Sequence, residues 1–278
     1  MATIRLVRFD IPCQDGESGA TPHKIPERRG LVMQSTRKVA LITGSATGIG
    51  RSTAIQLADR GYDIVVNYSK SRDDAEQTAI EVRSKGVEAL VIAANVADES
   101  AIKAMFAQTI AHFGGLNVLV NNAGTTHFID HTDLDSVTDD VWNDILSVNV
   151  KGLFSCCRAA MPHLKSRKGN IVNVASVAGL AGSGSSIPYA ASKGAVITLT
   201  KSLARAFAPE VRVNAVAPGP VQTRWLADHQ DMVQKAMAHT PMERPSTPDD
   251  IAEAIVFLAD VSTLMTGQVM VVDGGRTM

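Results

Sequence analysis

The sequence predicts an α/β fold: a doubly wound parallel sheet of seven strands, with helices on both faces. From Lys38 onward, seven short runs rich in Val and Ile alternate with longer amphipathic segments. Helical crossovers join parallel strands, and continuous apolar runs indicate strands covered on both faces. The chain of 278 residues is long enough to bury a substantial core. Its composition, 45% hydrophobic but only 4% aromatic, suits close packing of helices on a sheet.

The elements follow one another in a regular order. Strands are expected at 39–42, 63–67, 89–93, 118–120, 170–174, 211–216 and 269–272. Helices are expected at about 49–60, 73–85, 99–112, 138–164, 188–208 and 248–258. Gly61, Gly86 and Gly114 follow the first three helices, where a glycine commonly ends a helix. In a doubly wound parallel sheet, ligands bind at the carboxyl ends of the strands, and we expect the site of this protein there.

The first 37 residues differ from the rest of the chain. They contain Pro12, Pro22 and Pro26, charges of both signs and no sustained period. We therefore expect an irregular N-terminal extension over 1–37, either a genuine arm or an over-extended start with Met33 as the initiator. No linker divides the remainder, so residues 38–278 are expected to form one domain.

Composition excludes several classes of function. The 27 Lys and Arg residues balance 28 Asp and Glu, for a formal net charge of −1, which argues against a nucleic-acid or anionic-membrane partner. No apolar run approaches the ~18–20 residues of a membrane span. The three cysteines show neither disulfide nor zinc-site spacing, so no metal is expected. These features predict a cytoplasmic protein.

A glycine-rich turn separates the first strand from the first helix. It reads Thr43-Gly44-Ser45-Ala46-Thr47-Gly48-Ile49-Gly50. Glycines in this position let the backbone turn tightly and approach a pyrophosphate, which the free N–H groups and dipole of the helix attract. Because the cluster follows a strand and opens a helix, it predicts a dinucleotide site.

Together with Asn121-Asn122-Ala123-Gly124 and Tyr189-Ala190-Ala191-Ser192-Lys193, this turn resembles the short-chain dehydrogenase/reductase (SDR) family. The resemblance extends from about Lys38 to the C-terminus. It implies a Rossmann-like fold and a nicotinamide cofactor. It also implies a homotetramer, because members of this family typically form tetramers.

Tyr189 and Lys193 lie four residues apart in a predicted helix, so their side chains share one face. A neighbouring ammonium favours the phenolate form of a tyrosine, which would let Tyr189 exchange a proton with the substrate. Ser176 follows a strand at its carboxyl end. The resemblance implies that Ser176 orients the substrate, that Tyr189 is the acid/base and that Lys193 binds ribose. It also implies that Asn149 supports a proton-relay water.

The end of the second strand governs the choice of cofactor. It reads Asn67-Tyr68-Ser69-Lys70-Ser71-Arg72, with no acid before Asp73 to repel the phosphate of NADP. We therefore expect NADP(H) to be preferred, with Ser69 and either Lys70 or Arg72 near the 2′-phosphate. Thr47, however, stands where many NADP-dependent family members carry Arg, which leaves NAD(H) use open.

The other predicted cofactor contacts follow the later strands. Asn95 is expected beside the adenine, and Val221 and Thr223 at the nicotinamide carboxamide. The complete predicted cofactor set is Gly44, Ser45, Thr47, Gly48, Ile49, Gly50, Asn67, Tyr68, Ser69, Asn95, Val96, Asn122, Ala123, Gly124, Tyr189, Lys193, Pro218, Gly219, Val221 and Thr223.

Two segments are expected to set substrate specificity: a lid over 224–245 and a loop of small residues over 181–187. The open loop suits a small-molecule or carrier-bound carbonyl, and the chain looks most like 3-oxoacyl-[acyl-carrier-protein] reductases. The expected reaction interconverts a ketone and a secondary alcohol by hydride transfer. Two alternatives remain: a sugar or polyol dehydrogenase of the glucose 1-dehydrogenase type, and a non-catalytic regulatory protein that senses NADP.

Overall fold

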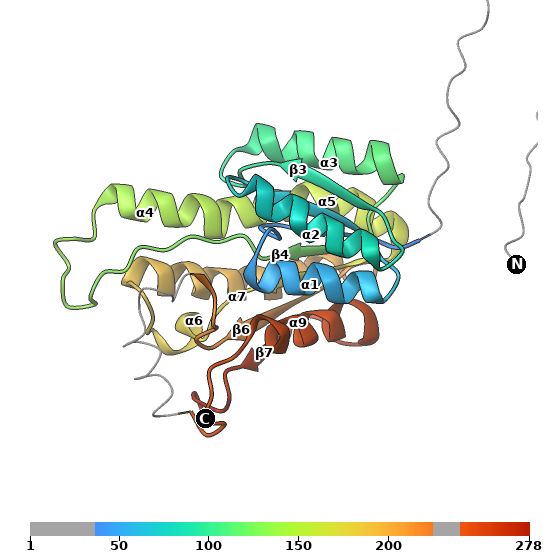
Figure 1. Ribbon diagram of the computed structural model, residues 1–278. Helices are drawn as coiled ribbons and strands as arrows, with labels where there is room; N and C mark the ends of the chain where they lie inside the picture. Colours follow the sequence, from blue (N-terminus) through green and yellow to red (C-terminus); the bar gives the residue numbers. More distant parts are fainter. Residues whose placement is uncertain (1–36, 225–239) are drawn as a thin grey trace, which may run out of the picture. The chain divides into compact units, whose positions relative to one another are not determined.

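The computed structural model describes residues 37–224 and 240–278. Seven parallel strands form one sheet in the order β3-β2-β1-β4-β5-β6-β7, which confirms the predicted fold class (Figure 1). The strands are β1 Val39–Ile42, β2 Asp63–Tyr68, β3 Ala89–Ala93, β4 Val118–Asn121, β5 Asn170–Val174, β6 Arg212–Pro218 and β7 Val269–Val272. The predicted extension over 1–37 lies, except for Arg37, outside the described residues.

Helices cover both faces of the sheet. The α-helices are α1 Gly48–Asp59, α2 Arg72–Ser84, α3 Glu99–Phe113, α4 Asp139–Leu146, α5 Leu153–Arg167, α6 Ala178–Ala181, α7 Ile187–Phe207 and α9 Pro248–Val256. Two π-helical segments are η1 Ser147–Gly152 and η3 Phe257–Val261. Helices α1, α2 and α9 pack on one face, and α3, α5 and α7 on the other.

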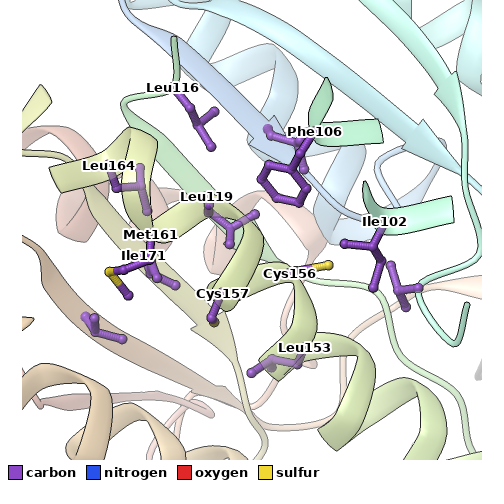
Figure 2. Close-up of a cluster of buried hydrophobic side chains, with 14 of the residues drawn as sticks. Ile102, Phe106, Leu116, Leu119, Leu153, Cys156, Cys157, Met161, Leu164 and Ile171 are labelled. Carbon is purple, nitrogen blue, oxygen red and sulfur yellow. The ribbon is translucent and has the colours of Figure 1, made fainter. Parts of the chain in front are cut away.

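A hydrophobic core lies on each face of the sheet. Apolar side chains that alternate in direction along the strands contribute to both cores. In β1, for example, Leu41 faces the α3/α5/α7 side and Ile42 the opposite side, and both are fully buried. Figure 2 shows the α3/α5 side, where Phe106 and Ile102 meet Leu119 of the sheet. Because the chain reverses its strand order between β1 and β4, a crevice is expected at their carboxyl ends.

The two cysteines of α5 belong to this core (Figure 2). Cys156 and Cys157 are free and fully buried. Burial raises the pKa of both thiols, most directly by removing water from around the thiolate form. Neither sulfur is therefore a nucleophile at neutral pH.

The expected helix over 138–164 is interrupted. Instead of a single α-helix, α4 passes through η1 into α5. At the end of η1, a Cβ on Gly152 would lie 2.4 Å from the carbonyl oxygen of Val96, so the helix approaches the end of β3 closely. Sequence periodicity does not record such a tertiary contact, and the π-helical turn was not predicted. The short helix α6 was also not predicted.

Local capping places the first turn of α7. The Ser186 hydroxyl accepts a hydrogen bond from the Tyr189 backbone N–H at 3.4 Å, and Pro188 occupies an early position where its missing N–H has no cost. Tyr189 therefore lies in the first turn of α7, near the carboxyl ends of the strands. No helix of the described residues is long and apolar enough to cross a membrane.

At the opposite, amino-terminal edge of the sheet, one carboxylate gathers three donors. Asp260 of η3 accepts hydrogen bonds from Lys38 Nζ and an Arg60 guanidinium nitrogen, each at 3.1 Å, and from the Tyr62 hydroxyl at 2.7 Å. The Asp260 side chain is only 18% exposed. These contacts join η3 to β1 and β2.

We expect Asp260→Ala to lower the free energy of unfolding by ~2 kcal/mol, because the largely buried carboxylate and its three hydrogen bonds are lost. Urea denaturation followed by circular dichroism measures the change. The matched control is Asp59→Ala, which breaks an ion pair to Lys85 whose side chains are 51% and 35% exposed and should change stability by less than about 1 kcal/mol. Equal losses in both variants would contradict the assignment.

Candidate active site

The glycine-rich turn has the backbone geometry of an anion cradle. Gly44 and Gly48 have φ angles of +62° and +57°, which residues with a side chain rarely adopt. A Cβ on Gly50 would lie 2.5 Å from the Gly44 carbonyl oxygen, so the start of α1 packs directly on the turn. Thr47, the N-cap residue of α1, makes no side-chain capping bond, and the first turn holds no acidic residue. The free N–H donors at this helix end fit the pyrophosphate of a dinucleotide.

Two of the predicted cofactor residues point away from the crevice. Asn67 is 1% exposed; its Oδ1 accepts from the Gly44 N–H at 3.0 Å and its Nδ2 donates to the Ala94 carbonyl at 3.0 Å. Ser45 is fully buried, and its hydroxyl donates to the Ile42 carbonyl at 2.8 Å. The side chains of Asn67 and Ser45 therefore hold the turn in place from behind.

The end of β4 is tied to the same turn. Asn122 donates from Nδ2 to the carbonyl oxygens of Thr43 and Gly44, at 3.0 and 2.9 Å. In return, the Thr43 hydroxyl accepts from the backbone N–H groups of Asn122 and Ala123, both at 3.0 Å. Thr43 was not singled out from the sequence, although it immediately precedes the first glycine of the motif.

Tyr189, Ser176 and Lys193 meet beside the carboxyl end of β5. The Ser176 side chain lies close enough to the Tyr189 hydroxyl to act on its pKa as a hydrogen-bond partner. Lys193 Nζ lies 5.6 Å from the centroid of the Tyr189 ring and donates to the carbonyl oxygen of Val174 at 2.9 Å. Lys193 is only 5% exposed. The structure thus brings together three of the four predicted catalytic residues.

Burial shifts the pKa values of both Tyr189 and Lys193. Burial raises the pKa of Tyr189 to about 12, and the Ser176 hydrogen bond opposes this only in part. Burial also lowers the pKa of Lys193 to about 8. Both shifts arise mainly because the two groups are removed from water, and Lys193 Nζ donates its hydrogen bond to the Val174 carbonyl. At neutral pH the Tyr189 hydroxyl is therefore protonated.

Asn149, the fourth predicted catalytic residue, lies in η1 and is 1% exposed. Its Oδ1 accepts from the Thr125 N–H at 2.8 Å, and its Nδ2 donates to the Thr125 carbonyl and the Ser192 hydroxyl, each at 3.0 Å. Ser192 in turn donates to the Tyr189 carbonyl at 2.7 Å. Asn149 therefore joins the segment after β4 to the first turns of α7. Ser192 was missed, although it stands within the Tyr189–Lys193 motif.

The segment after β6 reaches the glycine-rich turn. The Gly219 N–H donates to the Val272 carbonyl at 2.9 Å, and a Cβ on Gly219 would lie 2.9 Å from Cβ of Asp273. Further on, the methyl group of Thr223 lies 3.4 Å from the point where a Cβ would sit on Gly48. Pro218, Val221 and Thr223 therefore line the path from β6 to the turn. Of the predicted lid over 224–245, residues 225–239 lie outside the described residues.

The remaining predicted contacts lie at the ends of β2, β3 and β4 and in the first turn of α1. Ser69 and Asn95 are exposed, and the Asn95 side chain accepts from the Ala97 N–H at 3.1 Å. Val96 is 6% exposed and contacts η1. Tyr68, Ile49 and Gly124 are half-buried. No group of three His, Cys, Asp or Glu side chains that could hold a metal occurs within 37–224 and 240–278.

Comparison with known proteins identifies the family. A family model described as enoyl-(acyl carrier protein) reductase matches residues 44–277. A ketoacyl reductase assigned to the granaticin polyketide synthase of Streptomyces violaceoruber is 45% identical over 242 residues, covering 85% of this chain and 95% of its own. The 3-oxoacyl-[acyl-carrier-protein] reductase FabG of Staphylococcus aureus is 42% identical over 247 residues, covering 87% and 98%.

Solved structures agree with the sequence relatives. A gluconate 5-dehydrogenase from Burkholderia cenocepacia, solved in complex with NADP and tartrate, superposes with a TM-score of 0.79 at 34% identity and covers 86% of this chain and 95% of its own. The chain belongs to the short-chain dehydrogenase/reductase family and is an NAD(P)-dependent oxidoreductase that acts on CH–OH groups.

Proposed function

We propose that this protein is an NADP(H)-dependent reductase of 3-oxoacyl thioesters, which interconverts a ketone and a secondary alcohol. The observation that carries the proposal is the assembly of Tyr189 with Ser176 and Lys193 at the carboxyl end of β5, where burial keeps the Tyr189 hydroxyl protonated by raising its pKa. Reduction of a ketone builds negative charge on its oxygen, which needs a proton donor within hydrogen-bond reach. The relatives named as ketoacyl and 3-oxoacyl reductases support the thioester substrate.

In this proposal, the chain's own residues handle the oxygen and its proton. Ser176 donates a hydrogen bond to the carbonyl oxygen and orients it. Tyr189 then donates its proton to that oxygen and becomes a phenolate. The Lys193 ammonium, on the adjacent turn of α7, stabilises the phenolate by its positive charge. In oxidation of the alcohol, Tyr189 accepts the proton instead.

The nicotinamide cofactor, when bound, supplies or accepts the hydride. We propose that the donors of the 43–50 turn hold its pyrophosphate, that Asn95 lies beside the adenine, and that Val221 and Thr223 hold the carboxamide. Asn149 would act as a positioning residue, because it fixes η1 to Ser192 one residue before Lys193. A homotetramer and a cytoplasmic location remain predictions.

The preference for NADP(H) rests on the turn after β2. Ser69, Lys70 and Arg72 are exposed there, and neither cation forms an ion pair with another described residue. No carboxylate stands at the end of β2 to accept the ribose hydroxyls and repel the extra phosphate. Thr47, in place of an arginine, leaves NAD(H) as a weaker substrate.

A second candidate is a sugar or polyol dehydrogenase. It is favoured by the structural match to a protein named as a gluconate 5-dehydrogenase and by one from Brucella melitensis named as a glucose/ribitol dehydrogenase. A non-catalytic NADP sensor is disfavoured, because Ser176, Tyr189 and Lys193 are all present and assembled.

Steady-state kinetics separate these candidates. Purified protein is assayed with acetoacetyl thioesters and NADPH or NADH, and with a panel of aldoses and polyols and NADP⁺ or NAD⁺. We expect turnover of the thioester, with kcat/KM at least about tenfold higher for NADPH than for NADH, as one charged contact would give. Turnover of aldoses with none of any β-keto thioester would refute the assignment, and faster reaction with NADH would refute the cofactor preference.

A further inference from the structure

An ion pair crosses the cofactor side of the molecule. Arg224 directly follows Thr223, and its Nη2 lies 2.9 Å from Oδ2 of Asp74 in the first turn of α2. The two residues are 150 positions apart in the chain. Their side chains are 62% and 43% exposed, so the guanidinium stays accessible to a ligand in solution.

Contacts on both sides place this guanidinium over the glycine-rich turn. Thr223 contacts Gly48, as described above. One turn beyond Asp74, the Thr78 hydroxyl donates to the Ala46 carbonyl at 3.0 Å and docks α2 on the same turn. Arg224 therefore bridges from the Gly48 side of the turn to the start of α2.

The start of α2 lies close to the part of the site where NADP would differ from NAD, at the 2′-phosphate of its adenosine ribose. Helix α2 begins at Arg72, directly after the Ser69–Ser71 segment at the end of β2. In this fold the ribose of the adenosine half lies at the end of the second strand, so the 2′-phosphate of NADP would face this segment. Thr47 carries no positive charge, whereas the Arg224 guanidinium lies against Asp74 in the first turn of α2, which begins one residue after Ser71.

Resting on the proposed use of NADP(H), we propose that Arg224 is a specificity-determining residue that binds the 2′-phosphate of the cofactor. A guanidinium is always charged and matches the oxygens of a phosphate with two parallel donors. Asp74 holds Arg224 in position when no phosphate is present. Because an exposed ion pair contributes little stability, the guanidinium exchanges the carboxylate for the phosphate at little cost.

The inference also links the two ends of the cofactor site. Thr223, proposed to hold the nicotinamide carboxamide, is the neighbour of Arg224 in the chain. A contact between Arg224 and the 2′-phosphate would therefore fix the base of the segment after β6 while the nicotinamide is bound. Lys70 and Arg72 lie on the α2 side only and cannot make this link.

The test compares cofactor binding in Arg224→Gln, Asp74→Asn and the double variant. Dissociation constants for NADPH and NADH are measured by isothermal titration calorimetry on the full chain. For Arg224→Gln we expect a Kd for NADPH at least about tenfold higher and a Kd for NADH changed less than about twofold. Arg205→Gln removes an exposed arginine of α7 and is the control, expected to change neither constant.

The double variant separates direct contact from simple charge neutralisation. If Arg224 binds the phosphate, the double variant Arg224→Gln/Asp74→Asn has the same raised Kd for NADPH as Arg224→Gln. Recovery of wild-type NADPH binding in the double variant would show that Arg224 only neutralises Asp74 and would overturn the inference. A further variant, Thr47→Arg in the Arg224→Gln background, should restore NADPH binding, because the arginine then returns to the same neighbourhood.

Failure of this inference differs from failure of the proposed cofactor preference. If the wild-type protein binds NADH as tightly as NADPH, the preference itself is wrong, and Arg224 has no phosphate to recognise. If the wild-type protein prefers NADPH while Arg224→Gln weakens both cofactors equally or neither, the preference stands and only the role of Arg224 falls.

Discussion

Replacing Tyr189 with Phe is expected to lower kcat for ketone reduction by about 10²–10⁴-fold, the usual contribution of a positioned general acid. The ring and its packing in the first turn of α7 remain, but no hydroxyl is left to protonate the carbonyl oxygen. The Kd for NADPH should change by less than about threefold, because the phenyl ring still fills the same space. Single-turnover reduction of an acetoacetyl thioester measures the chemical step directly.

Tyr62→Phe is the matched control for this variant. It also removes one tyrosine hydroxyl, but at the amino-terminal edge of the sheet, where that hydroxyl donates to Asp260 at 2.7 Å. Tyr62→Phe should lose about 1 kcal/mol of stability and keep wild-type kcat. If Tyr189→Phe kept more than a tenth of wild-type kcat while binding NADPH normally, another group would have to be the proton donor.

The elements that could be predicted are those whose signals are local. Every predicted strand agrees with the structure to within two residues at each end, because alternating burial and β-branched composition are properties of a short window. The glycine-rich turn could also be predicted from its sequence. Its signal is local because glycine readily adopts the positive φ angles found at Gly44 and Gly48, and because the strand and the helix directly flank the turn.

The features that could not be predicted depend on distant contacts. The π-helical segment η1 forms where Gly152 meets the carbonyl of Val96, 56 residues earlier in the chain. Asn67 stands at the end of β2, where a cofactor contact was expected, but its amide turns inward to Gly44 and Ala94. The ion pair between Arg224 and Asp74 spans 150 positions.

The pKa of Tyr189 is a similar case. The motif predicts an ammonium group near Tyr189. The shift in the pKa of Tyr189, however, depends on burial and on the hydrogen-bond partner of that ammonium. In the structure Lys193 donates to Val174, and the two burial effects move both groups toward their neutral forms. Sequence spacing carries no information about either quantity.

Lys193→Met is expected to abolish turnover and, at the same time, to stabilise the fold. Without the ammonium, the Tyr189 phenolate loses its stabilising charge, so kcat should fall by about 10²–10⁴-fold. Stability should rise because burial lowers the pKa of Lys193 from 10.5 to about 8, which corresponds to a folding cost of about 3 kcal/mol at neutral pH. Losing the hydrogen bond to Val174 offsets about 1–2 kcal/mol of the gain, and the melting temperature should rise by about 4 °C.

The pH dependence identifies the source of this gain. Below pH 8 the lysine is protonated in both states, so the folded protein bears the whole cost of burying the charge. Between about pH 8 and 10.5 the unfolded chain binds more protons than the folded one, so wild-type stability rises with pH and the advantage of Lys193→Met disappears. Denaturant titrations at pH 7 and pH 10 measure this difference. Lys201→Met, an exposed lysine of the same helix, is the control. If it showed the same gain with the same pH dependence, burial of the Lys193 charge would not be the cause.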